Sequence, residues 1–225
     1  MPSGSHSVTL TAEEQAMLDG EHGPAVAMCM RIIVGVARAN GAEKLIEIES
    51  AHADGTLYHG EAGLDFTEKL VALGGKVKVK TTTNVGSLDL LHPNLVHGDE
   101  TLMSHGRRLM DAHIALGCEP TWSCAPYQAG HRPTFGSHVA WAESNAIAFV
   151  NSVLGARSDR YGDFLDLSAA VTGRVPFGGL HHDEARKAVL VLDFSEIDSK
   201  VFSEDAAWAA LGVLLGNRAG TRVAA

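Results

Sequence analysis

The stretch "EAGLDFTEKLVALGGKVKVKTTTN", residues 61–84, decides the fold class. Its first half fits a helix that ends at the glycine pair 74–75, where the chain can turn. Its second half, "KVKVKTTTN", alternates strictly between apolar and polar residues, and this period of two predicts a strand that ends at Asn84. A helix that leads directly into a strand is typical of an α/β domain.

The same succession of helices and strands occurs on both sides of this stretch. A capping-box pattern opens the first helix, and a proline opens the second. A strand is expected at residues 45–48, followed by a polar loop. The predicted helices span residues 11–20, 24–40, 61–75, 99–117, 143–154 and 161–172. We therefore expect one α/β domain over residues 1–225.

The composition argues against two classes of partner. The 225 residues carry a formal net charge of -9, whereas a protein that binds duplex nucleic acid needs Lys and Arg to neutralise phosphates. No apolar run approaches the roughly 20 residues of a membrane span. The N-terminus has no basic start followed by an apolar segment, so we expect a cytoplasmic protein without a signal peptide.

Polar side chains follow the predicted strands, where α/β sheets usually bind ligands. In "ESAHADGTLYHG", Gly55 lets backbone amides approach a ligand and Thr56 supplies a hydroxyl; the alternative is an ordinary Asp-Gly turn. In "TTTNVGSLDLLHP", Asn84 and the N–H of Val85 can bind a carboxylate or a hydroxyl. The alternative there is an Asx-turn in which Asp89 caps a helix.

Residues 120–157 hold two further candidates. Cys124, before an alanine and a proline in a turn, is suited to act as a nucleophile or a metal ligand, unless it is an inert thiol. Glu143, at the start of a helix, is a candidate general acid or base, and Ser144 can donate a hydrogen bond to a substrate carboxylate. The simpler interpretation of Glu143 is that an acidic side chain stabilises the helix N-terminus.

Five motifs taken in order resemble the aconitase X family. They are "LTAEEQAMLDGEHGPAVAMCMRII", "AHADGTLYHG", "TTTNVGSLDLLHP", "TWSCAPYQAGHRPTFGSHVAWAESNAIAFVNSVLGAR" and "RYGDFLDLSAAVTGRVPFGGLH". The resemblance runs from residue 10 to about residue 216 and implies an aconitase-like arrangement of layered sheet and helices. It also implies a dehydratase that carries an iron–sulfur cluster and acts on a small hydroxy acid.

The resemblance also assigns roles to residues. Cys124 matches a cluster ligand. The positions that match substrate contacts are Gly55, Thr56, Leu57, Asn84, Val85, Glu143 and Ser144. Known members dehydrate cis-3-hydroxy-L-proline or (R)-mevalonate 5-phosphate. The segments "VGSLDLLHP" and "RYGDFLD" favour the first, so the expected reaction forms Δ1-pyrroline-2-carboxylate.

Two features set this chain apart from the family pattern. The family's catalytic chain is longer and holds two more cluster cysteines, whereas Cys29 and Cys118 here do not match ligand positions. We therefore expect a domain shortened at its C-terminus that needs a small subunit or a C-terminal half. The apolar helix around residues 208–215 should then have an uncovered face.

Three other functions remain open from the sequence. The substrate could be mevalonate 5-phosphate. A hydrolase would use Cys124 as nucleophile with His131 or His138 as base. A non-catalytic fragment or interaction subunit would keep the fold and bind a partner without turnover.

Overall fold

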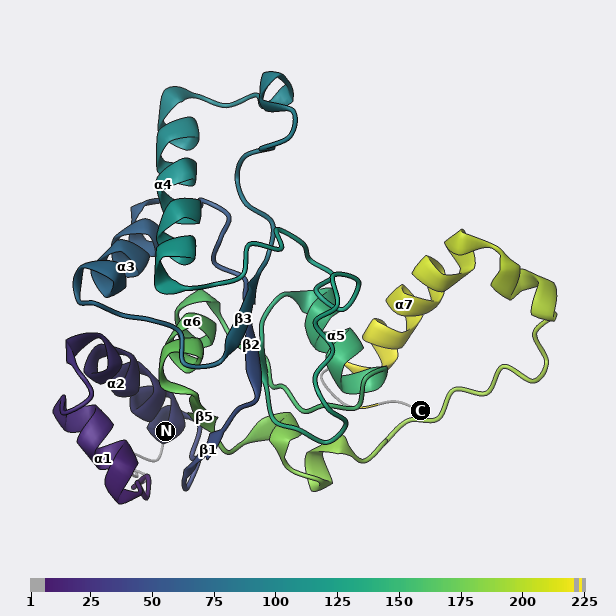
Figure 1. Ribbon diagram of the computed structural model, residues 1–225. Coiled ribbons are helices and arrows are strands. Elements are labelled where there is room, and N and C mark those ends of the chain that lie inside the picture. The colour runs from purple at the N-terminus through teal and green to yellow at the C-terminus, as the bar shows by residue number, and fades with distance from the viewer. Residues whose placement is uncertain (1–6, 221–222, 224–225) are drawn as a thin grey trace. The chain divides into compact units, whose positions relative to one another are not determined.

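The computed structural model describes residues 7–220 and 223, and it divides into two compact units. The first unit is Met1–Gly178 and the second is Gly179–Ala225. The first unit contains helices and a parallel sheet, which confirms the α/β class (Figure 1).

The elements of the first unit largely follow the predicted order. Its helices are α1 (Ala12–Asp19), α2 (Pro24–Ala39), α3 (Glu61–Ala72), α4 (Glu100–Leu116), α5 (Ser144–Ser152) and α6 (Asp163–Thr172). Its strands are β1 (Leu45–Glu47), β2 (Ser50–Ala53), β3 (Lys80–Thr83), β4 (Ala140–Trp141) and β5 (Arg174–Pro176). All six predicted helices are confirmed, with ends that shift by three residues or fewer.

The central sheet has three parallel strands in the order β3-β2-β4. β2 is the middle strand, and its residue His52 lies opposite Thr82 of β3 and Trp141 of β4. β1 and β5 form a separate antiparallel pair. Because the three central strands are parallel, their carboxyl ends meet at one edge of the sheet.

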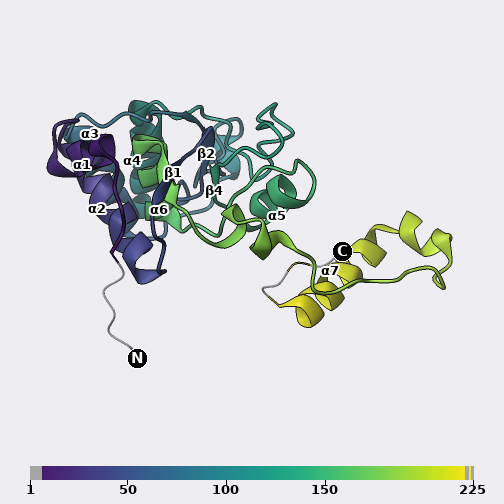
Figure 2. The same cartoon turned by 90° about the horizontal axis from the view of Figure 1, so that it is seen from below.

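Helices cover both faces of this sheet (Figures 1 and 2). Ala140 packs with Ala169 and Ala170 of α6, whereas its neighbour Trp141 packs with Ala146 of α5. Successive residues of a strand point to opposite faces, so two adjacent residues of β4 contact two different helices. The small alanines allow α6 to approach the backbone of the sheet closely.

A buried arginine joins α1 to β5. Arg174 forms ion pairs with Glu14 at 3.1 Å, with Glu13 at 3.3 Å and with Glu47 at 2.8 Å. Glu14 also completes the capping box, because its carboxylate accepts the N–H of Thr11 at 2.9 Å. The predicted capping box is therefore confirmed, and one of its members also neutralises a buried cation.

The prediction of a polar loop after residue 48 was wrong. Residues Ser50–Ala53 form the central strand β2, and all four are buried. Ser, Ala and His have weak strand propensities, but a middle strand of a parallel sheet is buried on both faces and is selected by packing. The strand predicted from the alternating segment at residues 76–84 is also longer than the observed one, because only Lys80–Thr83 pair in the sheet.

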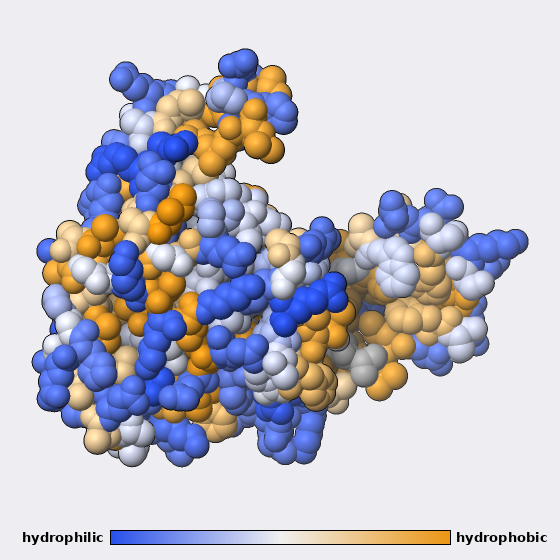
Figure 3. All heavy atoms as spheres, viewed as in Figure 1, coloured by the Kyte–Doolittle hydropathy of each residue, from blue (hydrophilic) through white to orange (hydrophobic). Residues whose placement is uncertain are grey.

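The second unit contains short 3-10 turns and one long helix, α7 (Asp205–Ala219). Trp208, Val213 and Leu214 of α7 are exposed, as expected for this helix, and hydrophobic residues gather over it in Figure 3. Among the described residues, no helix is both long enough and apolar enough to cross a membrane.

Candidate active site

The predicted substrate-contacting residues follow the ends of three neighbouring strands. Gly55 to Leu57 come after β2, Asn84 and Val85 come after β3, and Glu143 and Ser144 come after β4. The three strands are parallel, so all these residues lie at the same edge of the sheet. The expectation that polar residues gather where the strands end is confirmed.

Asn84 follows the outer strand β3 and is almost fully buried. Its Nδ2 donates to Oε2 of Glu143 at 3.1 Å and to Oδ1 of Asp54. Both acceptors are carboxylates, so the nitrogen of the amide must face them. Asn84 Oδ1 is buried and has no hydrogen-bond partner among the described residues. The amide therefore keeps one acceptor that no described residue uses.

Glu143 is held in an unusual backbone conformation at the start of α5. Its φ of 73° lies in the left-handed region, which non-glycine residues adopt rarely and often at functional sites. Burial alone would raise the pKa of its carboxyl. Hydrogen bonds from Ser144 Oγ at 2.9 Å, from Asn84 and from the backbone N–H of Asn145 outweigh burial and lower this pKa. Glu143 is therefore an anion at neutral pH.

The turn after β2 is tied to the turn after β3. Thr56 is fully buried, and its hydroxyl donates to the carbonyl of Val85 at 2.7 Å. Gly55 lies so close to Asp163 that an added Cβ would stand 3.0 Å from the aspartate's Cβ. Leu57 and Val85 are partly exposed. Thr56 thus positions the two turns, and a side chain at Gly55 would force Asp163 to shift by a few tenths of an ångström.

Cys124 is half-buried beside these carboxylates. Burial raises the pKa of its thiol, and the charges of Glu143 and Asp54 raise it further, against a lowering by the N–H of Val85. The carbonyl of Cys124 accepts a hydrogen bond from Asn145 Nδ2 at 2.9 Å. The structure thus brings Cys124 to the same edge as Asn84 and Glu143.

The other two cysteines lie elsewhere. Cys29 and Cys118 are buried in an apolar cluster with Leu70 and Leu116, and burial raises their pKa values to about 11 and about 12. No group of three or more His, Cys, Asp or Glu side chains within the described residues could hold a metal ion. The residues present therefore fit one ligand of an iron–sulfur cluster and not a complete site.

Two carboxylates were not among the predicted site residues. Asp54 and Glu143 both accept a hydrogen bond from Nδ2 of Asn84, and burial raises the pKa of Asp54. Asp166 of α6 is fully buried, and its Oδ2 accepts the backbone N–H of Asp54 at 2.7 Å. Burial also raises the pKa of Asp166 well above its ordinary value. The motif "RYGDFLD" contains Asp166, but only the fold brings it to Asp54.

A buried hydrogen-bonded chain lies in the sheet next to this site. Thr82 Oγ1 is 2.8 Å from Nδ1 of His52 and 2.8 Å from Nδ1 of His131, and both rings pack against Trp141. His131 is thus bonded to Thr82, and the ring of His138 packs against Phe177. The arrangement gives no support to a Cys124 nucleophile with either histidine as its base.

Comparison with known proteins identifies the family of this chain. Residues 7–184 match the family described as "Aconitase X first domain". This match covers more than half of the chain, so the chain belongs to the aconitase X family.

Particular relatives are dehydratases. A cis-3-hydroxy-L-proline dehydratase of Pseudomonas aeruginosa is 41% identical over 207 residues, which cover 92% of this chain and 35% of the relative. A phosphomevalonate dehydratase large subunit of Thermococcus kodakarensis is 38% identical over 216 residues, which cover 95% of this chain and 53% of the relative.

A solved structure of an aconitase X protein has a similar fold. The crystal structure of Thermococcus kodakaraensis aconitase X in its holo-form superposes with a TM-score of 0.83 at 36% identity. The match covers 96% of this chain and 53% of that chain. The chain therefore spans between about a third and about half of the length of these relatives.

Proposed function

We propose that this chain is the N-terminal part of the catalytic chain of an iron–sulfur-dependent dehydratase. Its substrate is a small hydroxy acid, cis-3-hydroxy-L-proline, and its product is Δ1-pyrroline-2-carboxylate. One observation carries the proposal: the turns after β2, β3 and β4 bring Asn84, Glu143 and Ser144 together with Cys124 at one edge of the sheet.

Glu143 binds the ring nitrogen of the substrate in this proposal. A carboxylate with a lowered pKa is a weak base but a good partner for a cationic secondary amine. Asn84 Oδ1 is the free acceptor next to it and takes a hydrogen bond from the ammonium or the hydroxyl of the substrate. Ser144 donates to the substrate carboxylate when its hydroxyl turns away from Glu143.

Cys124 is proposed to hold the cluster through its thiolate. When bound, the cluster supplies a Lewis-acidic iron for the leaving hydroxyl group. The raised pKa of Cys124 keeps it a thiol in the absence of metal, so loading the cluster releases a proton. The remaining ligands come from a small subunit or a C-terminal half.

The charges around the site favour hydroxyproline over mevalonate 5-phosphate. Neither Asp54 nor Glu143 forms an ion pair with Lys or Arg in the part of the chain that the structure describes. A phosphate bound here would face two carboxylates without a compensating Lys or Arg from the described residues, which is unfavourable. An amino acid brings its own positive charge to them.

Substrate assays test this function. The chain is purified under anaerobic conditions alone and together with the remaining two thirds of the Pseudomonas aeruginosa relative. Dehydration of cis-3-hydroxy-L-proline and of mevalonate 5-phosphate is then measured for both samples. We expect turnover of the first substrate by the completed assembly only. Turnover of mevalonate 5-phosphate alone contradicts the choice of substrate, and a cluster-loaded assembly without any turnover contradicts the catalytic assignment.

A further inference from the structure

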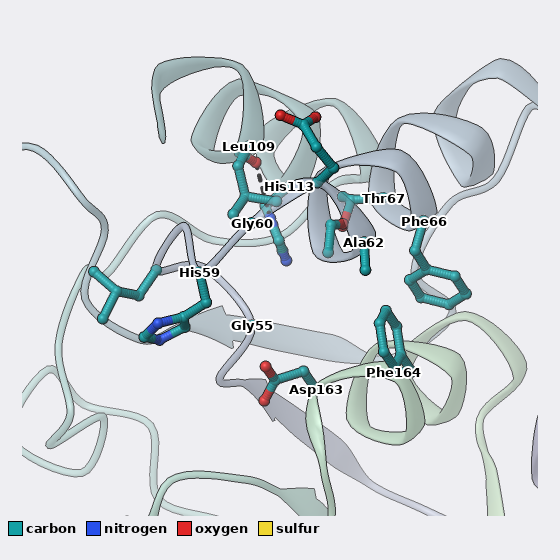
Figure 4. Close-up of a pocket in the computed structure, with 13 residues that line it drawn as sticks. Gly55, His59, Gly60, Ala62, Phe66, Thr67, Leu109, His113, Asp163 and Phe164 are labelled. Atoms are coloured by element: carbon teal, nitrogen blue, oxygen red, sulfur yellow. Dashed lines mark hydrogen bonds between the residues drawn. The ribbon is translucent and has the colours of Figure 1, made fainter. Parts of the chain in front are cut away.

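A cavity lies beside the turn after β2. Its volume is about 280 Å³, near the lower end of small-molecule pockets. Gly55 and Leu57 are shared with the candidate active site, but Asn84, Cys124 and Glu143 do not line it. The other walls include His59, the segment from Gly60 to Gly63, Phe66, His113, Asp163 and Phe164 (Figure 4).

His113 presents a hydrogen-bond acceptor to this cavity. The residue is only 1% exposed, and its ring points into the hollow in Figure 4. Its Nδ1 lies 2.9 Å from the carbonyl of Leu109 and must carry the proton to donate there. Burial lowers the pKa of His113, so the ring is neutral and its Nε2 carries a lone pair. Nε2 has no partner among the described residues.

Asp163 adds a negative charge to the same space. Its carboxylate extends into the cavity beneath Gly55, and His59 stands at the exposed rim (Figure 4). Asp163 forms no ion pair with Lys or Arg among the described residues. The side of the cavity that carries His113 and Asp163 therefore offers a hydrogen-bond acceptor and a negative charge, which suit an ammonium group.

Hydrogen-bond donors, in contrast to the acceptors of His113 and Asp163, lie at the start of α3. Gly60 to Gly63 line the cavity, Gly60 is the N-cap, and no side chain caps this helix. The first N–H groups of a helix have no intrahelical partner and carry a partial positive charge. They suit a carboxylate. Phe66 and Phe164 supply an apolar wall; their rings pack edge to face with centroids 4.9 Å apart.

We propose that this cavity is a second binding site for a free α-amino acid with an apolar side chain. The ammonium group binds Asp163 and Nε2 of His113. The carboxylate binds the N–H groups at the start of α3, and the side chain contacts Phe66 and Phe164. A phosphate would meet the charge of Asp163, whereas a zwitterion matches both walls.

The proposed site shares Gly55 and Leu57 with the candidate active site but does not involve its charged residues. It needs neither Cys124 nor Glu143, so binding can be measured without a cluster or turnover. Because Gly55 lies against Asp163, an occupant of the cavity contacts the same turn that carries Thr56 and Leu57.

L-leucine titration of the chain, followed by amide and histidine-ring chemical shifts, tests the proposal. We expect saturable shifts at Ala62, Gly63 and the His113 ring. N-acetyl-L-leucine lacks the cation and leucinamide lacks the carboxylate, so each should bind at least about tenfold more weakly. Asp163→Asn should weaken L-leucine binding roughly 10- to 150-fold, the range for a hydrogen bond to a charged group.

Two control variants locate the binding. Asp65→Asn changes an exposed carboxylate on α3 that does not line the cavity, and Glu143→Gln changes the candidate active site. Both should bind L-leucine as the unmodified chain does. Absence of saturable binding at millimolar L-leucine would overturn the proposal, as would equal binding of the two blocked ligands. Weakening by Glu143→Gln would place the ligand in the active site instead. The ligand series uses the unmodified chain, so it decides the matter even if a variant misfolds.

Discussion

Asn84 lies between two carboxylates, and this determines which atoms of the site are free for a ligand. Its two N–H bonds are used by Asp54 and Glu143, so only Oδ1 remains. The sequence predicts that Asn84 binds a carboxylate or a hydroxyl. With its amide held in this way, it accepts hydrogen bonds, which suits a hydroxyl or an ammonium group and not a carboxylate.

Ser144 is the residue whose removal tests the proposed carboxylate contact. Ser144→Ala in the completed assembly should lower catalytic efficiency roughly 10- to 150-fold, because a hydrogen bond to a charged partner contributes about 1.5–3 kcal/mol. Steady-state dehydration kinetics with cis-3-hydroxy-L-proline measure this. An unchanged kcat/KM would remove Ser144 from the site.

The site residues could be predicted singly, but their partners could not. Glu143 and Cys124 were found through their motifs. The hydrogen bond between Asp54 and Asn84 joins residues 30 positions apart, and that between Asp54 and Asp166 joins residues 112 positions apart. Such contacts depend on strand order, which no local pattern contains. The role of Thr56 as a tie between two turns was missed for the same reason.

At the scale of elements, helices were predictable and short strands were not. α1, α2 and α4 carry start and stop signals in their own residues, such as Thr11, Pro24 and Gly117. β2 carries none, because a buried middle strand is chosen by the helices that pack on it. The gathering of the candidate site residues at one edge of the sheet therefore depends on tertiary packing more than on the strand propensity of residues 50–53.

The ion pairs of Arg174 allow a test of how α1 is held. Glu14→Ala leaves a buried guanidinium without its buried partner, so we expect a loss of about 3–5 kcal/mol in unfolding free energy. Glu47→Ala removes a partner whose side chain is 77% exposed and should cost about 1 kcal/mol or less. Urea denaturation of both variants measures the difference. Equal losses would contradict the assignment of Glu14 as the main partner.

For the whole molecule, the buried histidines make stability depend on pH. Burial lowers the pKa of His52 to about 3 and that of His131 to about 4, from 6.5. Between pH 6.5 and these values the unfolded chain binds more protons than the folded one. The stability from the two neutral rings is therefore complete above pH 6.5 and falls as the pH is lowered toward 4.

His131→Gln should reduce this pH dependence. From pH 7 to pH 5 the unmodified chain should lose about 2 kcal/mol more stability than the variant, at about 1.4 kcal/mol per pH unit below 6.5. Denaturation at the two pH values measures it, and His97→Gln, at an exposed position, is the control. An identical loss in all three proteins would show that His131 is not held neutral.

The cysteine distribution predicts that the chain alone does not hold a stable cluster. It places one thiol at the site, where about three ligands are needed. Anaerobic reconstitution followed by iron and sulfide analysis should find less than one stable cluster per chain. Stoichiometric, stable loading would require Cys29 or Cys118 to leave the apolar core.

The central claim is that Cys124 holds the cluster of a hydroxyproline dehydratase, and one measurement tests it most directly. The completed assembly is prepared with Cys124→Ala and, as control, with Cys118→Ala, and visible absorbance and dehydration of cis-3-hydroxy-L-proline are recorded together. We expect Cys124→Ala to abolish both signals and Cys118→Ala to keep both. Full turnover and unchanged absorbance in Cys124→Ala would contradict the account.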